Sequence, residues 1–130
     1  MKTPDKSVLP DACKRSVCPV ASALDIVGDK WTLLVVRDLY MGKKTYSELQ
    51  KSPENIPTNI LADRLKRLQQ AGIIDRQSYQ TNPLRYAYRL TDKGRDLDRV
   101  LKAIVEWGNR HIPETMQIED IDSLFPRLSE

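Results

Sequence analysis

The sequence is poor in the residues that build metal centres, disulfide frameworks and membrane spans. Its 130 residues include two cysteines and one histidine, and no run of eighteen apolar residues occurs. Two cysteines are too few for a disulfide framework, and with His111 they assemble neither a structural zinc set nor a catalytic triad. We therefore expect a protein that is not an enzyme, that holds no metal or cofactor, and that does not enter a membrane.

The first residues also lack an export signal. Met-Lys-Thr-Pro-Asp-Lys is polar and no apolar segment follows it, so we expect a cytoplasmic protein in a reducing compartment. The length and the 40% of apolar residues suit one domain with its own core. We expect a flexible N-terminal arm over residues 1–17, a domain over 18–112 and a C-terminal tail over 113–130.

Positive charge is concentrated in the middle of the chain. Residues 43–91 carry nine basic and four acidic side chains, a local charge of +5 in a chain whose net charge is only +3. This distribution is expected if one face of the protein meets a polyanion, although many solvated surfaces are equally basic.

Apolar spacing and capping residues predict a series of helices before residue 72. A short helix begins at Pro19 and closes at Gly28, and Asp29 caps a second helix that ends at Gly42. The buried stripe of this second helix is expected at Trp31, Leu34, Val35 and Leu39. Thr45 and Glu48 have the spacing of a capping box at the start of a third helix.

The fourth helix begins at Pro57 and is followed by a hairpin. Leu61, Leu65 and Leu68 form one apolar stripe before Ala71-Gly72 ends this helix. The segments 73–79 and 86–90 are prone to form strands and are separated by turn residues, which predicts a β-hairpin. From Thr91 we expect one long helix that stops by Pro113, and then a short amphipathic turn at 118–125. Two helices joined by a brief turn and followed by a hairpin predict an α+β, mostly helical, winged helix-turn-helix fold.

Four ordered blocks of sequence resemble a known family. They are Cys18-Pro19-Val20, then GDKWTLLVVRDLYMGKKTYSEL at 28–49, IPTNILADRLKRLQQAGII at 56–74 and PLRYAYRLTDKG at 83–94, and Trp107-Gly108 follows them. The chain thus resembles the HxlR-type winged helix-turn-helix transcription regulators, which are relatives of the MarR group. The resemblance implies a homodimer that binds a double-stranded DNA operator in bacteria. It also implies that a cysteine before the first helix can sense electrophiles or oxidants.

The outward face of the fourth helix carries our candidates for contact with bases. If its leucines face the core, the 100° step places Thr58, Asn59, Ala62, Asp63 and Lys66 on the opposite side. Asn binds adenine, Asp accepts from cytosine N4, and Thr and Ala touch thymine methyl groups. We expect the phosphate backbone to be contacted by Arg64 and Arg67 on the helix flanks and by Lys43, Lys44 and Ser47 before it. At the wing tip, Asn82 and Arg85 are expected either to enter a minor groove or to contact phosphate. The alternatives are a solvated helix face and a merely soluble hairpin turn.

The two ends of the domain are expected to form a dimer interface. Its residues are Val20 and Leu24 in the first helix, and Leu97, Val100, Leu101, Ile104 and Trp107 in the long terminal helix.

Cys18 lies before Pro19 at a helix start, where unpaired amides favour a thiolate. We expect it to be a redox-sensing thiol that Cys13 resolves; the alternative is a small buried side chain.

Two other function classes remain open at this point. A winged helix without redox sensing can dock a protein partner instead of DNA, with its basic face incidental. A small redox enzyme built on the two cysteines is disfavoured by their Cys-x4-Cys spacing and by the lack of a βαβ pattern around them.

Overall fold

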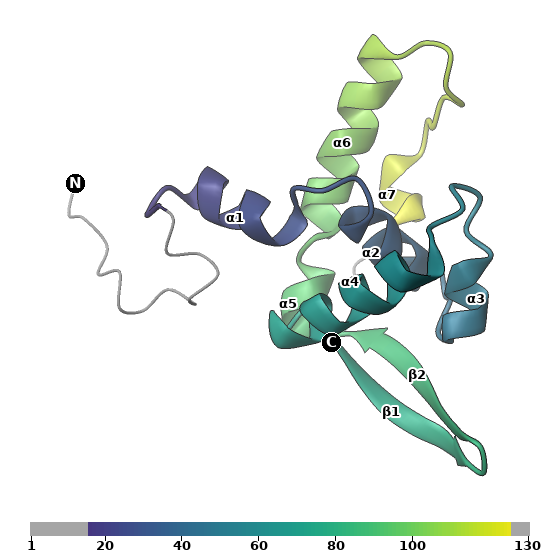
Figure 1. The fold of residues 1–130 in the computed structure, drawn as a ribbon. Coiled ribbons are helices and arrows are strands. Elements are labelled where there is room, and N and C mark those ends of the chain that lie inside the picture. Colours follow the sequence, from purple (N-terminus) through teal and green to yellow (C-terminus); the bar gives the residue numbers. More distant parts are fainter. Residues whose placement is uncertain (1–15, 126–130) are drawn as a thin grey trace.

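The computed structural model describes residues 16–125, so nearly all of the expected N-terminal arm, including Cys13, lies outside the described residues. Seven helices and one hairpin follow one another in this part of the chain (Figure 1). They are α1 (Pro19–Val27), α2 (Thr32–Tyr40), α3 (Tyr46–Gln50), α4 (Thr58–Gln70), β1 (Ile74–Thr81), β2 (Leu84–Leu90), α5 (Asp92–Arg95), α6 (Asp98–His111) and α7 (Ile121–Leu124). The predicted winged helix-turn-helix architecture is confirmed: α3 and α4 form the helix pair, and β1 and β2 form the wing.

The predicted capping residues define the helix boundaries. Asp29, expected as the cap of α2, lies two residues before the N-cap Trp31, and its Oδ1 accepts from the amides of Trp31 and Thr32 at 2.8 and 3.0 Å. Thr45 and Glu48 form both halves of the capping box at α3. Gly72 has a φ of +76°, which a residue with a Cβ rarely adopts, and it turns the chain from α4 into β1.

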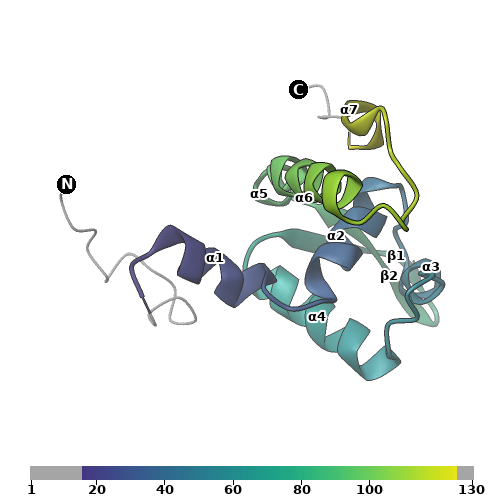
Figure 2. The same cartoon turned by 90° about the horizontal axis from the view of Figure 1, so that it is seen from above.

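The core lies where α2, α4 and the stem of the hairpin meet. In α2 the buried apolar side chains are Val35, Val36 and Leu39, whereas Trp31 and Leu34 of the predicted stripe are only half-buried. The stripe on α4 is as predicted, with Leu61, Leu65 and Leu68 buried. Figure 2 shows α2 between α6 and α4, with α1 reaching out from this body.

The hairpin is longer than its sequence pattern indicated. Its strands pair antiparallel from Ile74–Leu90 to Thr81–Leu84, with an irregularity between Ser78 and Gln80. Only Asn82 and Pro83 remain in the turn, because backbone pairing extends beyond the residues that alternate in polarity. The amide of Tyr88 donates to the carbonyl of Lys44 at 2.7 Å, so the wing is joined to the segment before α3.

The predicted long terminal helix is interrupted. It divides into α5 and α6, with a turn at Asp96 and Leu97. Gly94 lies where the backbone of α5 packs directly against the backbone of Ile73. A Cβ at this position would lie 2.1 Å from the carbonyl oxygen of Ile73, so only glycine fits. Leu101 is 6% exposed and belongs to the core. Its assignment to a dimer interface is therefore wrong, because its own domain already covers this side chain.

The tail beyond residue 112 packs on the domain. Phe125 is 1% exposed, and its ring meets that of Tyr40 edge to face at a centroid distance of 5.8 Å. The boundary expected at 112 therefore divides segments that share one core, because the tail returns along α6 and α7 contacts it. Within residues 16–125, no helix is both long and apolar enough to span a bilayer.

Candidate nucleic-acid interface

The side of α4 that faces away from the core is polar and accessible. Because Leu61, Leu65 and Leu68 point inward, Thr58, Asn59, Ala62, Asp63 and Lys66 are all exposed, as the helical spacing predicted. The first turn of α4 is fixed by the Tyr46 hydroxyl, which donates to the carbonyl of Thr58 at 2.9 Å. A rigid helix with an accessible polar side has the shape required for contact with base edges in a major groove.

The segment before α4 presents fewer accessible cations than the sequence indicated. Lys44 and Ser47 are exposed, in line with a role at the DNA backbone. Lys43 is half-buried instead, and its Nζ lies 3.5 Å from Oδ2 of the buried Asp38. A lysine held in this way stabilises the end of α2 and is less accessible to phosphate.

The loop that leads into α4 is held by an arginine of α2. Arg37 bonds both oxygens of Glu54, at 2.9 and 2.7 Å, and also bonds Asp38 and Ser52. The hydrogen bonds from Arg37 lower the pKa of the Glu54 carboxyl to about 2, and those to Glu54 and Asp38 raise the pKa of Arg37 above its ordinary value. This bidentate ion pair fixes the start of α4 relative to α2. Sequence spacing did not reveal it, since the partners are 17 residues apart.

The wing carries three arginines in different surroundings. Arg89 is bound by Asp75 at 2.6 Å, which raises the pKa of the guanidinium, and Arg76 lies over the ring of Tyr86 at 3.9 Å. Arg85 is exposed, as is Asn82 in the turn, and it forms no ion pair within the part of the chain that the structure describes. Arg85 is therefore the wing cation most available to an anionic partner.

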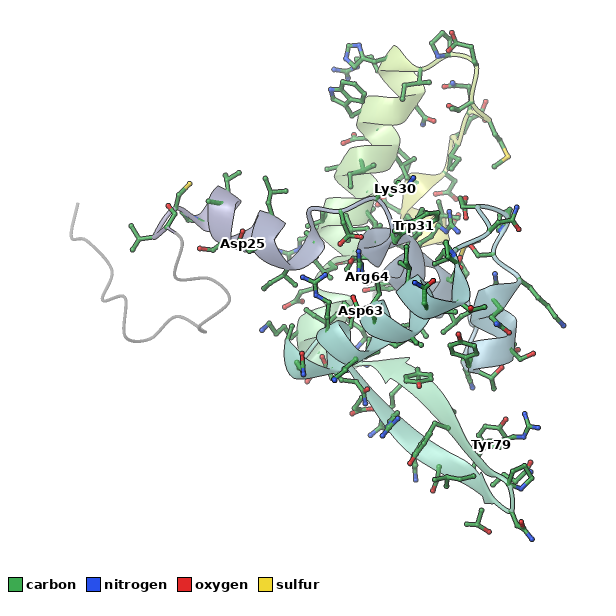
Figure 3. The ribbon with its side chains drawn as sticks, in the orientation of Figure 1. Asp25, Lys30, Trp31, Asp63, Arg64 and Tyr79 are labelled. Carbon is green, nitrogen blue, oxygen red and sulfur yellow. The ribbon has the colours of Figure 1, made fainter. Side chains whose placement is uncertain are left out.

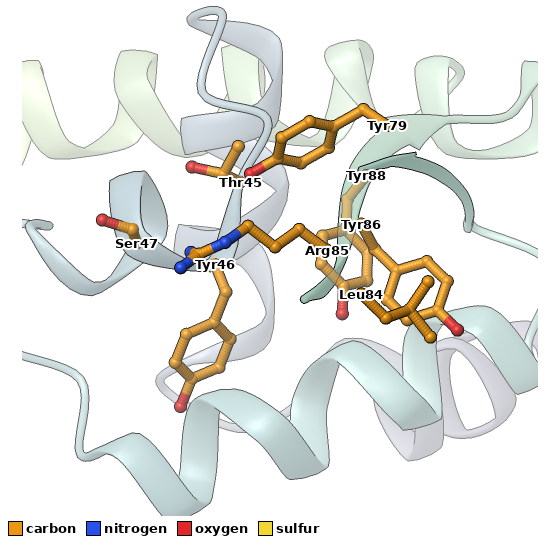
Figure 4. A pocket seen from close by; sticks show the side chains of 8 residues that line it. All are labelled: Thr45, Tyr46, Ser47, Tyr79, Leu84, Arg85, Tyr86 and Tyr88. Carbon is orange, nitrogen blue, oxygen red and sulfur yellow. The ribbon is translucent and has the colours of Figure 1, made fainter. Parts of the chain in front are cut away.

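A cleft of about 280 Å³ separates the wing from α3. Figure 4 shows Arg85 extending from the wing across this cleft toward Ser47. The remaining lining residues are Thr45, Tyr46, Tyr79, Leu84, Tyr86 and Tyr88. Charge and motif patterns in the sequence do not point to these tyrosines, although the alternation of Tyr86 and Tyr88 along the strand places both on one face. The cleft brings two of the predicted backbone contacts together, Ser47 of α3 and Arg85 of the wing.

Arg64 is not placed as the phosphate contact that the sequence predicted. Only 16% of its side chain is exposed, its Nε donates to Asp29 Oδ1 at 3.1 Å, and it also pairs with Asp63. Arg67, with 57% of its side chain exposed, lies 3.7 Å from Asp63 and remains accessible. A guanidinium shared between two carboxylates is poorly placed to bind a phosphate, because either pair must break first.

Cys18 lies immediately before α1 and its thiol is free and exposed. Hydrogen bonds from the amides of Ala21 and Val20 lower the pKa of this thiol below its ordinary value, because they stabilise the thiolate. The alternative of a buried structural cysteine is therefore wrong.

An apolar face runs along α1 and α6. Val20, Leu24, Ile104 and Trp107 are each more than half exposed, and Val100 is 39% exposed. Between the two helices lies a groove of about 480 Å³, in which Lys93 is the one charged lining residue within the described chain. Leu97 also lines this groove and is half-buried, so four of the seven predicted interface residues, Val20, Leu24, Leu97 and Val100, line it. Ile104 and Trp107 are exposed farther along α6 and are not part of its lining.

Metal ligands do not cluster in the described region: residues 16–125 contain no group of three His, Cys, Asp or Glu side chains arranged to hold an ion.

Comparison with known proteins identifies the family. The uncharacterised HTH-type transcriptional regulator Mb3122 of Mycobacterium bovis is 37% identical over 94 residues, which cover 72% of this chain and 59% of that relative. This chain therefore corresponds to about three fifths of the length of that relative. The solved structure of PA1607, described as a candidate transcription factor, is 39% identical with a TM-score of 0.71, over 82% of this chain and 75% of that one.

A second solved structure is the redox regulator HypR in its oxidised form. It is 32% identical with a TM-score of 0.66, over 72% of this chain and 97% of that one. Residues 26–116 match the model of the HxlR-like helix-turn-helix family. The chain belongs to the HxlR-like helix-turn-helix family.

Proposed function

We propose that this protein is a transcription regulator that binds double-stranded DNA sequence-specifically. The observation that carries the proposal is the accessible side of α4, which is flanked by the wing and its exposed Arg85. Asn59 and Lys66 contact base edges in the major groove, and Arg85 contacts the backbone beside it. The similarity to an HTH-type transcriptional regulator supports the same function.

The protein acts as a homodimer on a pseudo-palindromic operator. The apolar groove between α1 and α6 supports this assembly, because exposed Val20, Ile104 and Trp107 leave an apolar surface that a second copy covers. Each copy then presents one α4, and the two helices meet half-sites roughly 34 Å apart, about one turn of DNA.

The signal acts at Cys18. Its exposure and its stabilised thiolate favour reaction with small electrophiles and oxidants, and the similarity to a protein named as a redox regulator supports such a role. In the oxidation, two thiols give up two electrons and two protons to the oxidant and one S–S bond forms, between Cys18 and either Cys13 or Cys18 of the partner subunit. A crosslink at α1, which adjoins the apolar groove, changes the angle between the two copies and hence the fit of both α4 helices to fixed half-sites.

Selection from random DNA followed by a salt titration tests the function. Lys44, Arg67 and Arg85 in each copy provide six phosphate contacts per dimer, so the logarithm of the binding constant falls with the logarithm of the salt concentration with a slope of about −5. Between 50 and 200 mM salt the affinity for the selected site then drops roughly 10³-fold. If no sequence is enriched and binding responds weakly to salt, the winged helix is a protein-docking module and the proposal is wrong.

A further inference from the structure

Arg64 lies on α4 directly beside Asp63, which is one of the side chains on the accessible side of the helix. Its Nε donates to Asp29 Oδ1 at 3.1 Å, and its guanidinium also donates to Asp63 Oδ2. Figure 3 shows Arg64 and Asp63 together on α4, close to the turn that carries Lys30 and Trp31. Arg64 therefore joins a carboxylate at the start of α2 to a carboxylate on the exposed side of α4.

Asp29 is a fixed anchor for this arrangement. It also accepts hydrogen bonds from the backbone amides of Trp31 and Thr32, at the start of α2, and from the Thr32 hydroxyl, the last at 2.5 Å. Partial burial opposes ionisation, yet the hydrogen bonds from Thr32, Trp31 and Arg64 keep the pKa of Asp29 well below its ordinary value. With the ionised carboxylate held at the start of α2, the position of Arg64 is set by the helix scaffold.

Asp29 also lies close to the end of α1. Gly28 separates Asp29 from the last residue of α1, and a Cβ at Gly28 would lie 2.3 Å from the carbonyl oxygen of Leu24. The turn is therefore packed tightly against the final turn of α1. A contiguous path leads from α1 through Asp29 and Arg64 to Asp63.

We propose that Arg64 is a positioning residue that orients Asp63 and compensates its charge, and so determines which base α4 prefers opposite Asp63. The inference rests on the proposed function, in which α4 enters the major groove. A bare carboxylate there repels the phosphates, whereas one paired with Arg64, and lying 3.7 Å from Arg67, can approach DNA. Its remaining acceptor capacity then matches the amino group of cytosine N4.

The experiment compares base preferences of the full chain after selection from random DNA. Arg64→Gln is expected to alter the preference at one position of each half-site, by about fivefold or more in relative affinity, and Asp63→Asn alters the same position. The double variant Arg64→Gln with Asp63→Asn then matches Asp63→Asn alone, because the two residues act as one unit. Arg64→Lys, which keeps the charge, restores much of the original preference. Thermal unfolding followed by circular dichroism establishes that each variant is folded.

Arg85→Gln is the matched control, since Arg85 is an exposed arginine of the wing that forms no ion pair within the described residues and does not pair with Asp63. We expect it to weaken binding to all sequences alike and to reduce the salt slope by about 0.9 per copy, without altering the preference. If Arg64→Gln behaves in this way, or changes neither quantity, Arg64 is not a positioning residue. A wild-type protein that enriches no sequence overturns the proposed function as well, which distinguishes the two failures.

Discussion

Replacing Asn59 by alanine tests the assignment of the DNA-reading side of α4. Asn59 is exposed in the first turn of the helix, where Pro57 and Thr58 precede it, and it is not among the buried residues of α4. The substitution should therefore change the free energy of unfolding by no more than about 0.5 kcal/mol. Any large effect on binding must then come from the lost contact with DNA.

The expected magnitude follows from one contact per copy. A bidentate bond between an asparagine and adenine is worth about 1–3 kcal/mol of discrimination against the wrong base. The proposed homodimer places two copies of Asn59 on one operator, so discrimination between the operator and a site changed in both halves falls by about 2–6 kcal/mol. At 1.4 kcal/mol per factor of ten, this is roughly 30-fold to 10⁴-fold.

Arg85→Ala provides the contrast. Arg85 extends from the wing across the cleft toward α3, where it is placed to meet the backbone. Its loss should weaken binding to matched and altered sites equally and reduce the salt slope by about 0.9 per copy.

Fluorescence anisotropy with the selected operator and a doubly altered operator, at three salt concentrations, measures both effects. If Asn59→Ala leaves the ratio of the two affinities unchanged, the side of α4 that we assign to base contact is wrong.

Four further predictions follow from other parts of the structure. Ile104→Asp should convert the proposed homodimer to a monomer in sedimentation at micromolar concentration, whereas Met116→Asp, which alters an exposed apolar side chain outside α1 and α6, should not. Diamide should change the DNA affinity of the wild type but not of Cys18→Ser; equal responses would place the signal elsewhere. Phe125→Ala should lower the free energy of unfolding by about 3–5 kcal/mol in urea, and a loss under 1 kcal/mol would contradict its packing in the core. Because the pKa of Glu54 is held at about 2 in the folded chain, its ion pair stabilises the fold above pH 4.5 and ceases to do so as the pH falls toward 2. Glu54→Gln should therefore be destabilised at neutral pH yet lose less stability than the wild type over this range; parallel curves would refute this.

Most of the helix and strand boundaries were predictable because their causes are local. The Thr45–Glu48 capping box, the glycine at 72 and the leucine stripe of α4 each depend on residues within a few positions of one another. The exposed side of α4 follows directly from that stripe, since a helix that buries one face must present the other. Turn residues and alternation are also local, so the hairpin was predicted and only the length of its strands was underestimated.

The remaining properties depend on contacts between distant segments. Arg64 and Asp29 are 35 residues apart, and no pattern in the sequence indicates that Arg64 is held by the scaffold while Arg67 remains mostly exposed. Leu101 and Ile104 share the same apolar stripe, yet only packing decides that the first lies in the core and the second on the surface.

The burial of Phe125 also depends on the tertiary structure, because this side chain is covered only where the tail returns along α6. Periodicity and capping arise from the backbone geometry of neighbouring residues, so the sequence by itself determined the helices, the wing and the accessible side of α4. Which charges are compensated and which apolar side chains are covered depends on how those elements meet in space, and only the tertiary structure decided that.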